Sequence, residues 1–163
     1  MRPKSTVPAR SALDLLPGAT FADAFTLEVD DQNLDAISAA NKVMGTVPRW
    51  VSALLKLRNA IVRPFGLKGT THVARTTPDR IGLFPCLSRS PDRVVMGFND
   101  SHLDFRIAVD ASATAMTPKR ITATTVVKTH NIFGRAYLCT IMPFHKLIVR
   151  TLLGRLSEPK SRA

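Results

Sequence analysis

The chain is 163 residues long, the length of one domain, and its apolar content of 45% and charged content of 21% are ordinary for a folded globule. These values exclude global disorder, because such a chain has enough apolar surface to bury in a core. The net charge of +11 is unusual and predicts a surface that attracts anions, such as phosphates, nucleic acid, anionic lipid or an acidic partner. Neither Asp nor Glu occurs in residues 36–78 or 111–157, and each of these segments holds seven Lys or Arg residues.

We expect a cytoplasmic protein that does not span a membrane. The N-terminus lacks the continuous apolar run of a signal peptide. The most apolar long stretch, residues 132–153, is interrupted by Arg135, Pro143, His145, Lys146 and Arg150. Cys86 and Cys139 both have apolar neighbours, which favours buried thiols over a disulfide and fits a reducing compartment.

The first predicted elements are an arm, a strand and two helices. Residues 1–20 contain three prolines and predict an irregular N-terminal arm, and the alternation in Asp23–Val29 predicts a strand. A helix is expected over Leu34–Met44, because Asn33 can cap its start and Gly45 its end. A second helix begins at Pro48, with an apolar stripe at helical spacing. Its polar stripe is either an anion-binding ridge or a solvated face, and consists of Arg49, Ser52, Lys56, Asn59 and Arg63.

Four strands and a long helix are expected to follow. The predicted strands are Arg80–Leu87, Arg93–Asn99, Leu103–Ala111 and Lys119–Thr129. Each strand has apolar residues at alternate positions, so the sheet has an apolar face that needs a cover. The final helix provides it: Asn131 can cap the start, and Pro143 should kink the helix or divide it. The apolar stripe of this helix is Phe133, Tyr137, Ile141, Phe144, Ile148 and Leu152.

The predicted fold is therefore α+β, with an antiparallel sheet wrapped on a long C-terminal helix. This order of elements resembles a pared-down helix-grip, the fold of START and Bet v 1-like proteins. We expect one domain over residues 21–156, preceded by the irregular arm at 1–20 and followed by a basic tail at 157–163.

Several stretches together resemble a known bacterial family, the domain of unknown function family 2867. They are "PRWVSALLKLRNAIVRPFGLK", "IGLFPCL", "VVMGFNDSHLDFRIAV" and "TTVVKTHNIFGRAYLCTIMPFHKLIVRTLL". The resemblance covers about residues 21–153 and implies no established activity. It also implies that relatives can lie at the C-terminus of NAD-dependent epimerase-like chains. This sequence contains no G-x-G-x-x-G after a strand, so we expect no nucleotide-binding domain in it.

The clearest candidate site is a polar row on the strand at Leu103–Ala111. Alternation would place His102, Asp104 and Arg106 on one face, opposite Phe105. In a cleft, Asp104 could hold His102 or clamp Arg106, and Arg106 could bind a carboxylate or phosphate. The alternative is the wet outer face of a half-solvated sheet.

Three further candidates lie on or beside the last helix. His130 precedes the helix and could bind an anion at its free amides, or be a hydrogen-bonded histidine of the cap region. Tyr137 would lie at the mouth of a pocket between helix and sheet. His145 could satisfy the backbone carbonyl that Pro143 leaves free. The four histidines have no paired spacing, so we expect no metal site and no cofactor.

These observations favour a ligand-binding domain without catalytic chemistry. The sheet and the kinked helix would enclose an apolar pocket for a small hydrophobic or anionic ligand, such as a lipophilic acid, with Arg106 as the residue that touches it. One alternative is a small cyclase or isomerase that uses His102 and Asp104. A second is binding to nucleic acid or an anionic surface through the basic faces, although no RNA-binding aromatic signature is present. A homodimer is also compatible with the sequence.

Overall fold

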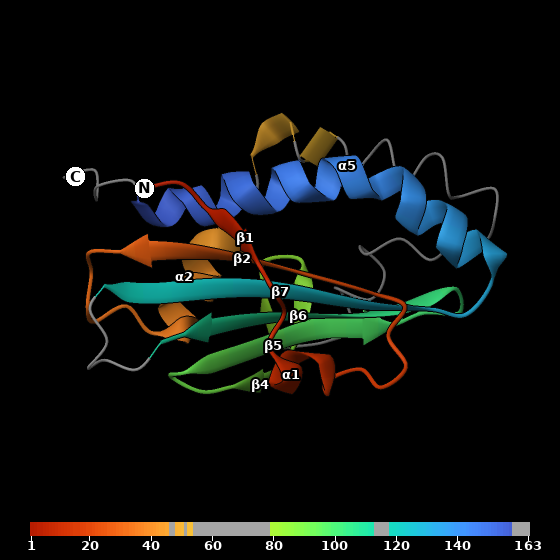
Figure 1. The fold of residues 1–163 in the computed structure, drawn as a ribbon, viewed down its shortest axis with the longest axis horizontal. Helices are drawn as coiled ribbons and strands as arrows, with labels where there is room; N and C mark the ends of the chain where they lie inside the picture. Colours follow the sequence, from red (N-terminus) through yellow and green to blue (C-terminus); the bar gives the residue numbers. More distant parts are fainter. Residues whose placement is uncertain (46–47, 51, 54–78, 113–117, 158–163) are drawn as a thin grey trace.

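The fold is built on one antiparallel sheet of seven strands that packs against a long C-terminal helix (Figure 1). The computed structural model describes residues 1–45, 48–50, 52–53, 79–112 and 118–157. Across the sheet the strands run in the order β1-β2-β7-β6-β5-β4-β3. The elements are β1 (Lys4–Thr6), α1 (Arg10–Leu13), β2 (Phe21–Val29), α2 (Ala36–Met44), β3 (Arg80–Ile81), β4 (Phe84–Arg89), β5 (Arg93–Asn99), β6 (Leu103–Ala111), β7 (Lys119–Thr129), α5 (Ile132–Gly154) and the 3₁₀ helix η2 (Arg155–Ser157). The predicted α+β class, with an antiparallel sheet and a C-terminal helix, is confirmed.

The main core lies between the inner face of the sheet and the helices α2 and α5. Strand alternation supplies it, because Phe25 of β2 is opposite Ala123 of β7, which in turn is opposite Val109 of β6. All three side chains are buried. From α2 the same core takes Ala36, Ala39, Ala40, Val43 and Met44, and from the end of α5 it takes Leu152 and Leu153.

The N-terminal segment covers the outer face of the sheet, which corrects the prediction of an irregular arm. Residues 4–6 pair with β2, α1 follows, and Figure 1 shows this segment crossing the face opposite α2. Ala12 and Leu16 of the segment are buried, and so is Val126 on the outer face of β7. The arm was missed because a three-residue strand held by backbone pairing leaves almost no side-chain pattern in the sequence.

The helix α2 begins two residues later than predicted, because Asp35 rather than Asn33 caps it. The Ser38 backbone N–H donates to Asp35 Oδ1 at 2.7 Å. Hydrogen bonds from the Ser38 side chain and backbone lower the pKa of the Asp35 carboxyl from its ordinary value. Asn33 instead donates its backbone N–H to Asp31 in the preceding turn.

Replacing Asp35 with alanine should lower the free energy of unfolding by about 1 kcal/mol at neutral pH, the usual contribution of an N-cap. Because the folded-state pKa lies below the unfolded one, this contribution is present above the unfolded pKa and disappears as the pH falls through the folded value. Urea unfolding at neutral and acid pH measures the difference. Asp35→Asn is the control, since it keeps a cap without the titration; equal pH profiles for Asn and Asp would contradict the assignment.

The bounds of β5, β6 and β7 are those that the alternation predicts. The strand predicted at Arg80–Leu87 is instead two strands, β3 and β4, separated at Gly82, whose φ of 60° breaks the extended backbone. The helix predicted from Pro48 lies largely outside the described residues, as does most of the predicted basic tail.

The helix α5 runs through Pro143 as one element, with Asn131 as its N-cap, and Figure 1 shows it changing direction along its length. Pro143 therefore does not divide it. Phe133 and Phe144 were predicted on the stripe of α5 that faces the sheet, but both are exposed. A different side of the helix therefore faces the sheet at these two positions.

The prediction that both thiols are buried is wrong for Cys139, which is exposed on α5, while Cys86 is partly buried. Both cysteines are free.

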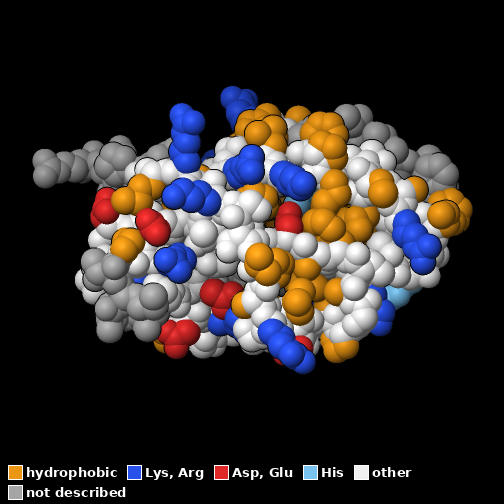
Figure 2. Space-filling model, viewed as in Figure 1, with side chains coloured by type: hydrophobic (Ala, Val, Ile, Leu, Met, Phe, Trp, Pro, Cys, Tyr) orange, Lys and Arg blue, Asp and Glu red, His pale blue; other side chains and the backbone are white. Residues whose placement is uncertain are grey.

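On the face shown in Figure 2, basic side chains are spread out rather than gathered in one patch. Figure 2 shows Lys and Arg across the visible face, with fewer Asp and Glu and with hydrophobic side chains between them. Five acidic side chains of the described residues pair with Arg or His: Asp23, Glu28, Asp79, Asp104 and Asp110. No helix in the described part of the chain is long and apolar enough to cross a membrane.

Candidate ligand-binding site

An apolar cavity of about 210 Å³ lies between the inner face of the sheet and α5. Twenty-two of the described residues line it, and most of these are apolar. The polar exceptions are Asp100, His102, Thr125, Tyr137 and His145. A cavity with this lining, apolar walls and a few polar groups, has the composition of a small-molecule site.

The sheet side of the cavity follows from register. Phe105 is opposite Val127, and Ile107 is opposite Thr125, so alternate residues of β6 and β7 form one continuous wall. Phe105 packs edge-on against two more aromatic rings, Phe98 at a centroid distance of 4.5 Å and Phe84 at 5.6 Å. These contacts hold the wall rigid, because aromatic edge-to-face pairs favour one geometry.

The helix side of the cavity comes from one face of α5. Residues three and four apart share a helix face, and the lining repeats at this spacing along five turns. The lining residues of α5 are Gly134, Tyr137, Leu138, Ile141, Met142, His145, Ile148, Val149 and Leu152. Tyr137 and His145, two of the residues singled out from the sequence, are thus part of the wall.

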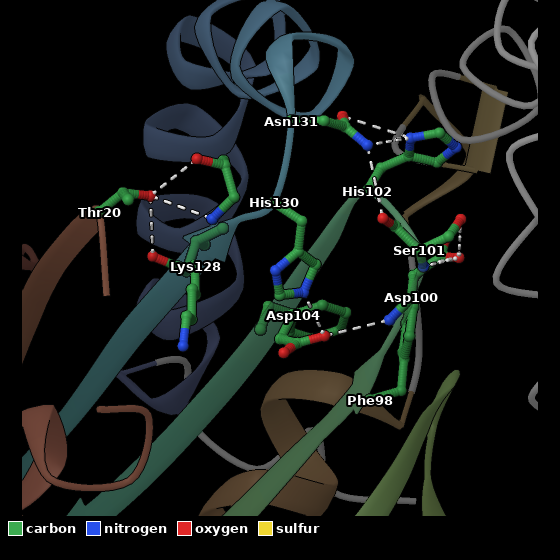
Figure 3. A network of polar contacts seen from close by, with 12 residues as sticks. Thr20, Phe98, Asp100, Ser101, His102, Asp104, Lys128, His130 and Asn131 are labelled. Carbon is green, nitrogen blue, oxygen red and sulfur yellow. Dashed lines mark hydrogen bonds and ion pairs between the residues drawn. The ribbon is translucent and has the colours of Figure 1, made fainter. Parts of the chain in front are cut away.

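His102 lies at the end of the cavity where the β5–β6 turn meets the start of α5. Asn131 Nδ2 is 3.0 Å from His102 Nδ1 (Figure 3). The Phe133 ring is edge-on to the imidazole, with 6.2 Å between the ring centroids. His102 precedes β6 and is not part of it, so the alternation that grouped it with Asp104 and Arg106 does not apply. The prediction that all three share one face is wrong for this reason.

Asp104 pairs with His130 and not with His102. The His130 Nε2–Asp104 Oδ1 distance is 3.1 Å, and the Asp100 backbone N–H donates to the same oxygen at 3.3 Å (Figure 3). Neither Asp104 nor His130 lines the cavity. This contact joins β6 to the segment that leads into α5, so we interpret it as a contact that stabilises the fold.

Arg106 also points away from the cavity. Its guanidinium Nη1 donates to the backbone carbonyls of Phe105 at 2.8 Å and Phe98 at 3.3 Å. Its side chain crosses Gly97 on the neighbouring strand, where a Cβ would be 3.1 Å from Arg106 Cδ. The residue predicted as the strongest ligand contact is therefore bound to the backbone on the outer side of the sheet.

Asp23, which the sequence pattern did not single out as a site residue, contacts His145. The His145 Nε2–Asp23 Oδ1 distance is 3.1 Å, and their side chains are only 18% and 14% exposed. Asp23 Oδ2 is buried with no hydrogen-bond partner. The signal was present: Asp23 interrupts the apolar row Phe21, Phe25, Leu27, and a carboxylate in such a row needs a partner. His145 thus contacts Asp23, where the sequence suggested the carbonyl freed by Pro143.

No cluster of three or more His, Cys, Asp or Glu side chains that could hold a metal occurs in the part of the chain that the structure describes.

No curated protein and no solved structure is significantly similar to the chain. The family model "Protein of unknown function (DUF2867)" matches residues 15–152, which include all the described residues that line the cavity. The chain therefore belongs to this family.

Proposed function

We propose that the chain binds a small, largely apolar molecule in the cavity between α5 and the sheet. The observation that carries the proposal is the cavity of about 210 Å³ with its apolar walls. Protein interiors rarely contain voids larger than a water molecule, and an engineered apolar cavity of about 150 Å³ binds benzene. The size therefore suits a molecule of one or two rings, or a short acyl chain.

The charge of the chain supports an anionic or weakly acidic ligand. The helix α5 forms one wall of the cavity and carries Arg135, Lys146 and Arg150 without any acidic residue. A positive potential raises the local concentration of anions and stabilises a negative charge that forms at the site. The order of elements adds a fold-level argument, because the helix-grip proteins, to which we propose the fold is related, use the corresponding space for apolar ligands.

We infer binding without catalysis as the function of this pocket. The enzyme alternative required His102 and Asp104 to act together, and Asp104 instead contacts His130 on the other side of the sheet. The remaining polar groups of the described lining are few against its apolar walls, a composition that suits the orientation of a bound molecule.

Filling the cavity tests the proposal. Ile141→Phe adds a ring to the wall and should abolish binding of small aromatic probes such as indole, while Leu147→Phe on the exposed side of α5 should not. At a probe concentration 100 times its Kd, the unmodified chain should gain about 2.7 kcal/mol of stability, measured by thermal shift. Native mass spectrometry of the purified protein should also detect a copurified small molecule. If the probe stabilises the two variants equally, the cavity is not the binding site.

A further inference from the structure

The described part of the chain contains two His–Asp pairs of equal length, and only one of these two belongs to the proposed pocket. His130–Asp104 and His145–Asp23 both have Nε2–Oδ1 distances of 3.1 Å. His145 lines the cavity and His130 does not. The His145 pair is also the more buried one, since its side chains are 18% and 14% exposed against 35% and 15%.

The state of the His145 ring follows from its partner. An ionised carboxylate only accepts hydrogen bonds, so Nε2 of His145 carries a proton and donates it to Asp23. In the neutral ring the other nitrogen, Nδ1, is then a lone-pair acceptor, and it has no hydrogen-bond partner among the described residues.

Charge balance in the cavity selects the kind of ligand that this acceptor suits. A carboxylate ligand would bring its negative charge close to Asp23, whose Oδ2 already lacks a partner. A neutral hydroxyl compound brings no charge. If its proton moves to Nδ1, the O–H bond breaks, the N–H bond forms, and the total charge of the site stays the same.

The surroundings of the pair favour this proton transfer. Arg150 of α5 lies over the Phe25 ring, 5.3 Å from its centroid, and Phe25 is two residues from Asp23 on the same face of β2. Lys146 follows His145 directly. Lys146 and Arg150 are exposed and do not line the cavity, so they act on an oxyanion beside His145 through the positive potential of α5 and not by contact.

We propose that His145, positioned by Asp23, is the polar anchor of the pocket, and that the ligand is a small phenol or enol that is bound with its proton transferred to His145. This inference rests on the proposed function, because it concerns the same cavity. It replaces Arg106 as the expected ligand contact and specifies how a lipophilic anion would arise: from a neutral molecule that ionises in the site.

Absorbance titration with 4-nitrophenol tests the proposal, because the bound anion absorbs in the visible range and the neutral molecule does not. At a pH at which the free probe is protonated, the unmodified chain should produce the anion band. It should bind 4-nitrophenol about 10- to 100-fold more tightly than 4-nitrotoluene, the advantage of a hydrogen bond to a charged group. His145→Gln should lose both the band and the preference. Asp23→Asn should lose the band while retaining binding, which a merely structural role would not cause.

The second His–Asp pair supplies the matched controls, His130→Gln and Asp104→Asn, which should keep both band and preference. Thermal unfolding of each variant shows whether it is folded, and the Asp23 variant stands as an independent test if His145→Gln does not fold. Equal binding of the two probes without an anion band would contradict the role of His145 as the polar ligand contact, but would still support the cavity as the binding site. Failure of both probes to bind would overturn the pocket as well.

Discussion

Replacing Phe25 with alanine should lower the free energy of unfolding by about 3–5 kcal/mol, the usual cost of removing a buried aromatic side chain. Phe25 is 2% exposed and lies in the main core beneath α5. Its removal leaves a cavity in the core cluster that also contains Leu153, and it deprives Arg150 of the ring over which its guanidinium lies. Because a domain of this size has a total stability of about 5–15 kcal/mol, the variant should unfold at a much lower urea concentration.

Phe144→Ala is the matched control, since it removes the same side chain from a position that is 46% exposed on α5. It should change stability by about 1 kcal/mol at most, because half-exposed side chains contribute less packing. Equal effects of the two substitutions would contradict the placement of the core between the inner face of the sheet and α5.

The strands and the last helix could be predicted because local rules determine them. Alternation at Leu103–Ala111 and Lys119–Thr129 gives the observed bounds of β6 and β7, since a period of two specifies both the element and its buried face. Asn131 marks the start of α5 because its side chain accepts from the Gly134 N–H, an ordinary N-cap contact. These features depend on residues only a few positions apart.

The pairings within the site could not be predicted, because they join distant parts of the chain. Asp23 and His145 are 122 residues apart, and nothing in local pattern assigns one to the other. For His102 the error was one of a strand boundary: a residue just before β6 can turn into the cavity, whereas one position later the pleat determines its direction. Asp104 contacts His130 because β6 and β7 are neighbours in the sheet and His130 directly follows β7.

Gly134 is the position where the start of α5 meets the β5–β6 turn, and Gly134→Ala should destabilise the chain although alanine is the better helix former. A Cβ at Gly134 would be 2.2 Å from the His102 carbonyl oxygen and 3.5 Å from Thr129 Cβ. The same carbonyl accepts from the His130 N–H at 2.9 Å, so it cannot withdraw without breaking that bond. We expect a loss of about 1–3 kcal/mol, the cost of overpacking, measured by urea unfolding.

The same substitution should also weaken binding of small aromatic probes, because Gly134 and His102 both line the cavity and α5 would have to move away from the sheet there. Gly154→Ala provides the control on the same helix. Its Cβ would meet only the Pro3 ring, at 3.9 Å, and helix propensity should then raise stability by up to about 1 kcal/mol. If the two variants change stability with the same sign, propensity and not the close approach to His102 governs Gly134, and the start of α5 is free to move relative to the pocket.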